Sequence, residues 1–308
     1  MGRLHLMTVF VAVAEEESFA AGARRLSMSP PAVTRAISTL EDCLEVKLLN
    51  RTTRYVRVTD AGSRYLDDCR RIIHEIDEAD EAAAGINAEP RGHLAVTAPV
   101  MFGKLFVIPV IVDYLRRYSD MEVSAVFLDR VVNLLEEGFD VGIRIGQLPD
   151  STMRAIRIGH VRRVLCASPS YISKYGLPSN PNELIQHSIV SASGVSPVMD
   201  WKFFPDISVK LKPRLTVTSN DAAIEAALAG MGVTRLLSYQ IQTHLASGQL
   251  QTLLTEYEPP PLPIHIIHRE GRYPSAKVRS FVDLMVAALR TSYSQIWCMR
   301  IKRPAVFD

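Results

Sequence analysis

The sequence is poor in cysteine, in long apolar runs and in net charge, and the first two shortages each exclude a class of protein. The four cysteines are scattered along 308 residues without a paired motif: Cys43, Cys69, Cys166 and Cys298. This spacing argues against a disulfide framework and a zinc site, and for a reducing compartment. No apolar run reaches the roughly 18 residues that a membrane helix needs. We therefore expect a cytoplasmic protein without a membrane segment.

Residue sets typical of export, catalysis or metal binding are missing too. The apolar stretch from Met7 to Ala14 is followed by three glutamates instead of a small-residue cleavage site, so we expect a helix rather than a signal peptide. The eight histidines show no metal-binding spacing, and the chain has neither a glycine-rich phosphate loop nor a Gly-x-Ser-x-Gly motif. We therefore expect no cofactor or metal. These missing motifs are only weak evidence against an enzyme, and our expectation that the protein is not an enzyme rests on the DNA-binding region described next.

Two short helices joined by a tight turn are predicted within residues 18–44. Ser18 can cap the first helix, because its hydroxyl can accept a free N–H of the first turn. Pro30-Pro31 opens the second helix, where proline costs little since first-turn N–H groups have no partner. The second helix has an inward apolar stripe with spacings of four, three and four residues: Val33, Ile37, Leu40 and Leu44. Its outer face carries short donors and one guanidinium: Ser29, Thr34, Arg35 and Ser38.

A hairpin with a cationic tip is predicted after the second helix. The tip holds Arg51, Thr52 and Arg54, and residues 55–59 then alternate between apolar and polar. From residue 18 to residue 58 the chain has seven basic and three acidic residues, a net charge of +4. A helix-turn-helix followed by such a wing predicts binding to duplex DNA, with residues 29–38 in the major groove. A small helical domain with a solvated basic face is the alternative.

The expected DNA contacts follow from this arrangement. Arg35 is the candidate for reading a base edge, whereas Arg51 and Arg54 would bind phosphate. The full expected set is Ser29, Pro30, Pro31, Thr34, Arg35, Ser38, Arg51, Thr52 and Arg54.

Residues 1–85 resemble the winged-helix region of the LysR-type transcriptional regulators. The matching residues are Phe10, Val13, Ser18-Phe19, Ala23-Arg24-Arg25-Leu26, Ser29-Pro30, Ala32-Val33, Arg35-Ala36-Ile37, Leu40-Glu41, Leu48-Leu49, Arg51-Thr52-Thr53-Arg54 and Thr59-Asp60-Ala61-Gly62. One position departs from the pattern: Glu45 stands where the family usually has glycine. The resemblance implies a winged helix-turn-helix that binds operator DNA.

Residues 60–84 predict one long helix with an apolar seam. The seam is a heptad repeat with one polar member: Leu66, Cys69, Ile73, Ile76, Asp80 and Ala83. A helix this long has no core of its own and needs a partner, either in the same chain or in a second copy. The resemblance favours a dimerisation helix, so we expect a homodimer or homotetramer. Residues 85–92 form the expected hinge.

From residue 93 onward, predicted strands alternate with helices. Helices are expected at 102–117, 131–137, 220–229 and 275–293, between strands at 94–97, 122–128, 140–145, 164–167, 209–218, 233–234 and 264–268. This alternation predicts parallel α/β sheets, and two lobes joined by two crossing strands give a fold of periplasmic-binding-protein type. Residues 92–290 also resemble the LysR-type effector domain, with matches at Ala98-Pro99, Gly103, Glu136-Glu137-Gly138-Phe139-Asp140, Arg144-Ile145-Gly146, Ala167-Ser168-Pro169-Ser170-Tyr171 and Ala229-Gly230-Met231-Gly232-Val233.

We therefore predict an α/β protein with an N-terminal winged helix-turn-helix, a linker helix and a two-lobed α/β effector-binding domain of periplasmic-binding-protein type. The expected boundaries are 1–60 for the DNA-binding domain, 61–88 for the linker and dimerisation helix, 89–163 plus 266–293 for lobe I, 164–265 for lobe II, and 294–308 for a C-terminal tail.

Effector-binding residues are expected where strands end and helices begin, because ligands of open α/β sheets lie beyond the carboxyl ends of strands. Free N–H groups at such turns suit an anionic group. The expected cleft residues are Thr97, Ala98, Pro99, Val100, Met101, Arg144, Gly146, Ser219 and Asn220, with Phe127 and Trp201 as aromatic walls. Helix capping or core packing is the alternative for each of them.

The whole sequence predicts a regulator that binds double-stranded operator DNA and is controlled by a small-molecule effector, an organic acid or aromatic compound, between its lobes. RNA polymerase is a further candidate partner. Two alternatives stay open at this point. One is a DNA-architectural protein, for which a cleft domain would be unneeded. The other is an enzyme or solute-binding protein with a merely regulator-like N-terminus.

Overall fold

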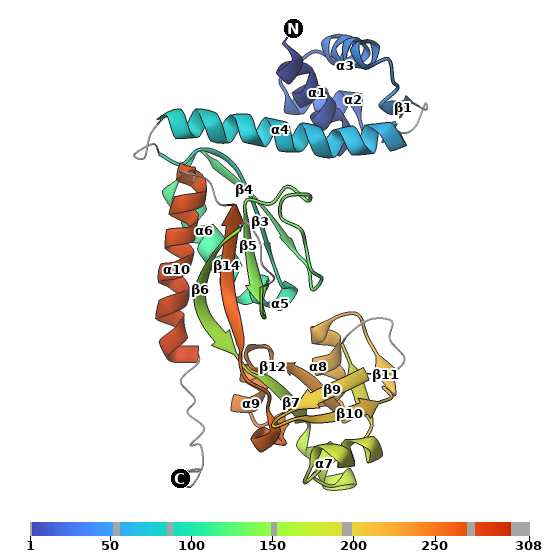
Figure 1. Ribbon diagram of the computed structural model, residues 1–308, viewed down its shortest axis with the longest axis vertical. Coiled ribbons are helices and arrows are strands. Elements are labelled where there is room, and N and C mark those ends of the chain that lie inside the picture. Colours follow the sequence, from blue (N-terminus) through green and yellow to red (C-terminus); the bar gives the residue numbers. More distant parts are fainter. Residues whose placement is uncertain are drawn as a thin grey trace.

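The computed structural model describes residues 2–51, 56–84, 89–148, 153–192, 199–269 and 275–296. They form a helical N-terminal head, the long helix α4 (Asp60–Ala84) beside it, and two α/β lobes arranged one beyond the other (Figure 1). No helix within these ranges is long and apolar enough to cross a membrane. The winged helix-turn-helix, the linker helix and the two-lobed α/β domain of the prediction are thus confirmed.

The head consists of three helices and a short hairpin: α1 (Arg3–Glu15), α2 (Phe19–Arg25), α3 (Pro30–Leu44), β1 (Leu49–Arg51) and β2 (Val56–Val58). Ser18 caps α2 as predicted, since its Oγ accepts the N–H of Ala21 at 3.3 Å. The inward stripe of α3 is confirmed as well, because Val33, Ile37 and Leu40 are fully buried in the core of the head. The helices α2 and α3 therefore fold as their local caps and apolar spacing predict.

The predicted wing hairpin is confirmed for its two strands, β1 and β2. β1 and β2 pair antiparallel, with Leu49 opposite Val58 and Arg51 opposite Val56. The predicted tip, residues 52–55, lies outside the described residues. The alternating pattern of 55–59 therefore gives the expected strand in its described part.

The turn after α3 shows why the departure at Glu45 matters. Glu45 ends α3 with φ 54° and ψ 26°, in the left-handed region. This conformation costs an L-residue with a Cβ about 1–2 kcal/mol and costs glycine little. The glycine that the resemblance leads us to expect here would therefore suit the turn better than the glutamate does.

The seam of α4 is used largely within the chain. Cys69 is fully buried in the core of the head, and Leu66 and Ile73 pack against the same core. Further along, Ile76 is half-buried and Asp80 is exposed. The first half of the seam thus has its partner in its own head, which leaves only the second half for contact with another copy.

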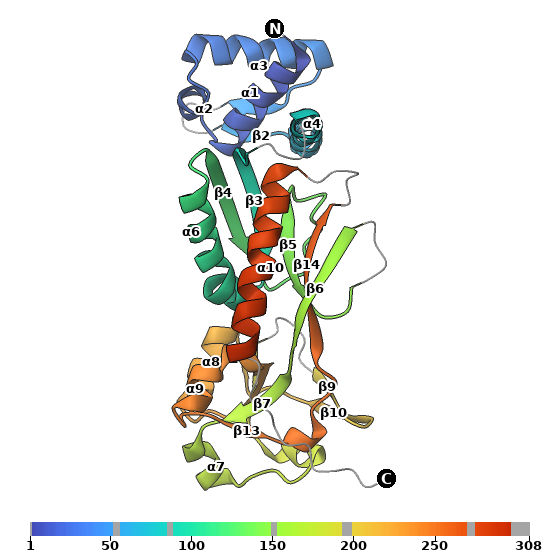
Figure 2. The ribbon, with the colours of Figure 1, turned by 90° about the vertical axis from the view of Figure 1, so that its left-hand side faces the viewer.

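Lobe I is a five-stranded sheet of order β4-β3-β5-β14-β6. Its strands are β3 (Gly92–Ala98), β4 (Met121–Phe127), β5 (Val141–Ile145), β6 (Met153–Val161) and β14 (Leu262–Arg269). Its helical segments are α5 (Val100–Phe102), a π-helical turn at Gly103–Val107, α6 (Ile108–Arg117) and α10 (Ala276–Ile296). α6 and α10 lie beside this sheet (Figure 2), and their buried side chains share one core cluster with its strands. The Tyr114 hydroxyl ties the two helices together by donating to the Lys277 carbonyl at 3.0 Å.

Two predictions about lobe I were wrong. The sheet is mixed instead of parallel: β3 runs parallel to β4 and β5, but β14 runs antiparallel to β5 and β6, because it returns from lobe II and enters from the opposite end. The helix expected at 131–137 is a series of turns. There the Glu137 carboxylate accepts the Asn133 N–H, and Arg144 donates to the Val132 carbonyl at 2.6 Å. Such side-chain bonds to the backbone compete with a helix.

Lobe II holds a second five-stranded sheet, of order β11-β8-β12-β7-β13, and a separate β9–β10 hairpin. Its strands are β7 (Arg163–Ala167), β8 (Ile189–Ser191), β9 (Met199–Phe203), β10 (Ile207–Leu211), β11 (Leu215–Thr216), β12 (Val233–Leu237) and β13 (Gln251–Leu253). Its α-helices are α7 (Pro169–Tyr175), α8 (Asn220–Leu228) and α9 (Gln242–Ala246), and its 3₁₀ turns lie at Pro181–Gln186, Ser238–Gln240 and Thr255–Tyr257. The sheet is again mixed, since β7 is antiparallel to β12 and β13.

The lobes are joined by two crossing segments. β6 leads almost directly into β7, and the chain returns through β14, which begins at Leu262, two residues before the expected strand at 264–268. Packing also joins the lobes, since the Tyr239 ring of lobe II lies edge-on to Phe102 and Phe106 of lobe I, with centroids 5.5 and 5.8 Å apart. The two lobes thus share part of their core at the point where the two segments cross between them.

Candidate functional site

The outer face of α3 presents the residues expected to contact DNA. Ser29, Pro30, Pro31 and Arg35 are exposed, whereas Thr34 and Ser38 are half-buried. Acidic side chains are missing from the first turn of α3, so this end carries no charge that would repel phosphate. A helix with short donors and one free-standing guanidinium at its N-terminal half has the shape and chemistry for the major groove.

The wing is only partly described. The backbone of Arg51 lies in β1, while its side chain, Thr52 and Arg54 fall outside the described residues. Arg57 on β2 is exposed and adds a cation to the same hairpin. Arg25 is held by Glu15 at 2.7 Å, so its charge is already partly neutralised within the head.

Glu41 fixes the wing to α3, a role that sequence reasoning missed. Its side chain is 3% exposed. Glu41 Oε1 accepts the N–H groups of Leu48 at 2.9 Å and Leu49 at 3.1 Å, and Oε2 accepts from Lys47 Nζ at 2.7 Å. Burial raises the pKa of Glu41, but the hydrogen bonds from Lys47, Leu49 and Leu48 outweigh it, so the pKa is lowered overall. The sequence signal for this role was the position of Glu41 directly after Leu40, a residue of the inward apolar stripe.

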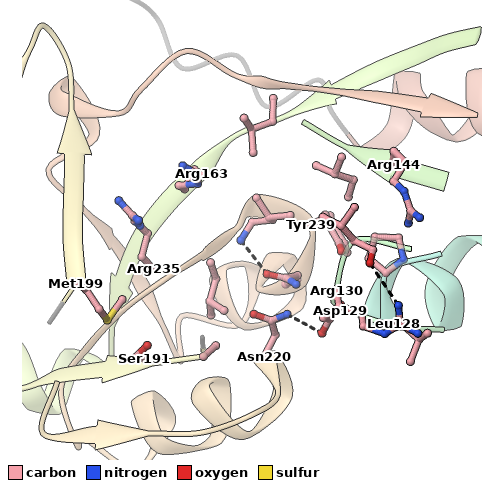
Figure 3. A pocket seen from close by; sticks show the side chains of 18 of the residues that line it. Leu128, Asp129, Arg130, Arg144, Arg163, Ser191, Met199, Asn220, Arg235 and Tyr239 are labelled. Atoms are coloured by element: carbon pink, nitrogen blue, oxygen red, sulfur yellow. Dashed lines mark hydrogen bonds between the residues drawn. The ribbon is translucent and has the colours of Figure 1, made fainter. Parts of the chain in front are cut away.

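A cavity of about 410 Å³ lies between the lobes and is lined by both (Figure 3). Four residues of the expected cleft set line it, namely Pro99, Arg144, Trp201 and Asn220. Lobe I adds Asp129 and Arg130, and lobe II adds Arg163, Ser191, Arg235 and Tyr239. The fold therefore brings both lobes to one pocket, with a different set of side chains from the one predicted.

The remaining expected residues lie beside the pocket or in the core. Thr97 and Ala98 are fully buried in lobe I, and Met101 and Phe127 pack against the same core. Phe127 fills the space over Gly103, where a Cβ would meet its ring at 2.5 Å. Val100, Gly146 and Ser219 lie outside the cavity wall. Core packing, the alternative noted for each position, thus accounts for four of the eleven.

The N–H group at the start of α5 is already occupied. Asp129 Oδ1 accepts the Val100 N–H at 3.0 Å. Asp129 Oδ2 accepts from Asn220 Nδ2 at 3.1 Å (Figure 3). One carboxylate of the chain itself therefore sits between the two strand-to-helix turns where we expected an anionic ligand group. It also forms a polar bridge from lobe I to lobe II.

Two arginines that sequence reasoning missed bring positive charge to the lobe II side of the pocket. The Arg235 guanidinium stacks on the Trp201 ring, 4.7 Å from its centroid, and its Nη1 is buried without a hydrogen-bond partner among the described residues. Burial and the neighbouring Arg163 lower the pKa of Arg235 to about 9, and burial lowers the pKa of Arg163. Arg235 stays cationic at neutral pH. In the described parts of the chain, neither has a carboxylate at salt-bridge distance.

Strand register explains why these two cations meet. β7 and β12 are antiparallel, with Arg235 opposite Leu165 and Arg163 opposite Leu237. The two arginines are thus diagonal neighbours on one face, at a spacing of about 7–8 Å. Arginine is almost never buried without a partner, so an arginine inside each of two apolar strands was the sequence signal for this site.

A helix-turn-helix head joined to a two-lobed domain with a cationic cleft defines a DNA-binding regulator with a ligand-binding domain. Family models agree: residues 4–63 match "Bacterial regulatory helix-turn-helix protein, lysR family", and residues 87–290 match "LysR substrate binding domain". The chain belongs to the LysR family of transcriptional regulators, and it is a regulator rather than an enzyme.

Individual relatives show the same architecture. The chain is 34% identical to the HTH-type transcriptional activator AaeR of Escherichia coli over 287 residues, covering 92% of this chain and 93% of AaeR. It is 32% identical to an HTH-type transcriptional repressor of Pseudomonas aeruginosa, with 92% and 91% covered. Among solved structures, CrgA of Neisseria meningitidis matches with a TM-score of 0.59 at 29% identity, covering 92% of this chain and 98% of CrgA. The Vibrio cholerae virulence activator AphB has the same fold, with a TM-score of 0.62 at 24% identity and 93% and 99% covered.

Proposed function

We propose that this regulator acts in the cytoplasm, binds operator DNA through α3 and the wing, and responds to an anionic organic effector bound in the cavity between its lobes. The observation that carries the effector class is the half-buried pair Arg163 and Arg235. Neither has a carboxylate at salt-bridge distance among the described residues, although the Asp200 charge acts on Arg235. Cations that are partly withdrawn from water without an ion-pair partner lose solvation energy, and an anion between the lobes would offset that loss. The Trp201 ring is buried beneath Arg235 and supports the guanidinium, so the charge of the effector, rather than an aromatic part, is what this site selects. At the promoter, RNA polymerase is the partner whose activity the regulator would change.

The effector site can be tested on the full chain by thermal shift with a panel of aliphatic and aromatic carboxylates. Arg235→Met keeps an unbranched, flexible side chain that covers the apolar stem of the arginine, and it removes the cation. It relieves a desolvation cost of about 1–4 kcal/mol and loses stacking worth about 0.5–2 kcal/mol. Without ligand, the variant should therefore melt at the same or a higher temperature than wild type, yet it should lose the shift produced by the carboxylates that stabilise wild type.

Lys210→Met, on the exposed side of β10, serves as the matched control and should keep the ligand shift. Carboxylates that stabilise Arg235→Met as much as wild type would remove Arg235 from the site. A panel in which no organic anion stabilises wild type would refute the proposed effector class.

The DNA contacts can be tested by selecting bound sequences from a random duplex pool. Arg35→Ala should change the selected sequence, because a bidentate contact to a base contributes about 1–3 kcal/mol of discrimination. The double variant Arg51→Ala with Arg54→Ala should select the wild-type sequence with lower affinity, and its salt slope should fall by about 2. Arg116→Ala on α6 is the control. A changed sequence preference with an unchanged salt slope in the double variant would refute phosphate binding by the wing.

A further inference from the structure

The two ends of the cavity differ in charge. At the lobe II end stand Arg163 and Arg235, described above. At the lobe I end stands Asp129, held by one N–H from each lobe. Two cations share that end: Arg130 pairs with Glu137 at 2.8 and 2.5 Å, and Arg144 donates to the Val132 carbonyl and interacts with the Glu137 charge. The lobe I end thus sets two carboxylates against two cations, whereas the lobe II end is cationic, so the cavity is polarised from one lobe to the other.

Asp129 is fixed in position but not saturated. Each of its oxygens accepts one hydrogen bond in the structure, and an ionised carboxylate offers about four acceptor positions. The side chain is exposed and lines the cavity, so a ligand can reach the remaining positions. Burial and the charge of Asp129 raise the pKa of Tyr239, the buried tyrosine on the same wall, which agrees with a negative potential at this end.

A second carboxylate cannot share this end of the cavity at low cost. It would face the Asp129 charge directly, and the Val100 N–H that could receive it is already donated to Asp129. A hydroxyl or an amine, by contrast, would donate to an acceptor that is already oriented. Hydrogen bonds to a charged acceptor are about twice as strong as neutral ones.

We infer that the cavity selects an effector with its anionic group at Arg163 and Arg235 and a hydrogen-bond donor, a hydroxyl or an amine, at Asp129. This inference rests on the proposed function, because it assigns the orientation and the second functional group of the same anionic effector. Asp129 is thus the residue that determines which end of the effector enters lobe I. Asp129, bonded to the Val100 N–H, thus places the donor end of the effector where the sequence alone placed the anion.

Matched compound series test this inference by calorimetric titration of the full chain. The probes are straight-chain carboxylates of increasing length and benzoates, each with a far end that is methyl, hydroxyl, amino or carboxyl. Asp129→Asn keeps the side-chain shape and removes the charge. Asp206→Asn, in the turn between β9 and β10, is the control.

In wild type, hydroxyl- and amino-ended probes should bind roughly 10-fold or more tightly than the methyl-ended probe of the same length, and the carboxyl-ended probe should bind most weakly. Asp129→Asn should lose the preference for amines and admit the carboxyl-ended probes, while Asp206→Asn should behave as wild type. Equal or tighter binding of carboxyl-ended probes by wild type would overturn the inference, as would an unchanged ranking in Asp129→Asn. If no probe of any series bound, the proposed function itself would fall, and the inference with it.

Discussion

Glu41 offers the sharpest test of how the head is held together. The perturbation is Glu41→Ala or Glu41→Gln in the full chain. Lys47 is 73% exposed, so its ion pair contributes only about 0–1 kcal/mol. The main effect comes from the buried N–H groups of Leu48 and Leu49, each of which costs about 1–3 kcal/mol without an acceptor. Glu41→Ala should therefore destabilise the head by about 2–6 kcal/mol, and Glu41→Gln, which keeps one acceptor oxygen, by about 1–2 kcal/mol.

Hydrogen exchange read by mass spectrometry locates this effect. The amides of Leu48 and Leu49 should exchange faster in both Glu41 variants than in wild type, whereas peptides of lobe II should be unchanged. Asp42→Asn, at the exposed neighbouring position, is the control and should lie within about 0.5 kcal/mol of wild type. Equal protection of Leu48 and Leu49 in wild type and Glu41→Ala would refute the assigned role.

Acid provides an independent check with a defined sign. The pKa of Glu41 is lower in the folded state than its ordinary value of 4.5. Its contribution to the free energy of unfolding is therefore fully present above that value and is lost as the pH falls through the lower folded-state pKa. The stability gap between wild type and Glu41→Gln should shrink in urea titrations as the pH drops below about 4.5. A gap that widens in acid would contradict the hydrogen-bonded, ionised carboxylate.

Three further predictions concern the turn after α3, the linker helix and the core of lobe I. Glu45→Gly should raise the free energy of unfolding of the head by up to about 1 kcal/mol: it removes the strain of a side chain in the left-handed region, and the greater entropy of glycine in the unfolded chain offsets part of that gain. Urea unfolding followed by circular dichroism measures this change. Glu45→Ala, which keeps a Cβ, should show no gain. Ile76→Glu should weaken dimers without unfolding the head, since Ile76 is half-buried beyond the stretch that packs on the head; unchanged dimer strength in sedimentation would exclude this part of α4 from the interface. Thr97→Val should raise stability by about 1 kcal/mol, because the Thr97 hydroxyl is buried without a hydrogen-bond partner among the described residues, and should leave the effector response intact; loss of that response would place Thr97 in the site after all.

The DNA-binding head was predictable because its determinants are local. Ser18 caps α2, Pro30 opens α3, and the stripe from Val33 to Leu40 packs inward. Each of these acts between residues a few positions apart, where the sequence pattern fixes the geometry. The seam of α4 was less predictable, since the same apolar residues can face a second copy or their own head, and the structure uses Cys69 for the head.

The segment at 131–137 shows how tertiary contacts overrode a local pattern. The alternation of strands and helices placed a helix there, but Arg144 of the neighbouring strand donates a hydrogen bond to the Val132 carbonyl. The same limit applies to the sheets. Strand alternation predicted their presence, yet the antiparallel β14 follows from the path of the chain through lobe II.

By itself, the sequence determined that this chain has a winged helix-turn-helix, a linker helix and two α/β lobes, because caps, prolines and apolar periods act over short separations. Only the tertiary structure decided the polarity of the cavity. Asp129 and Asn220 are 91 positions apart and meet across the cleft, and Arg163 and Arg235 become neighbours through the register of β7 and β12. Charges that meet through strand crossing and sheet register leave no local pattern, so their arrangement is a property of the folded chain.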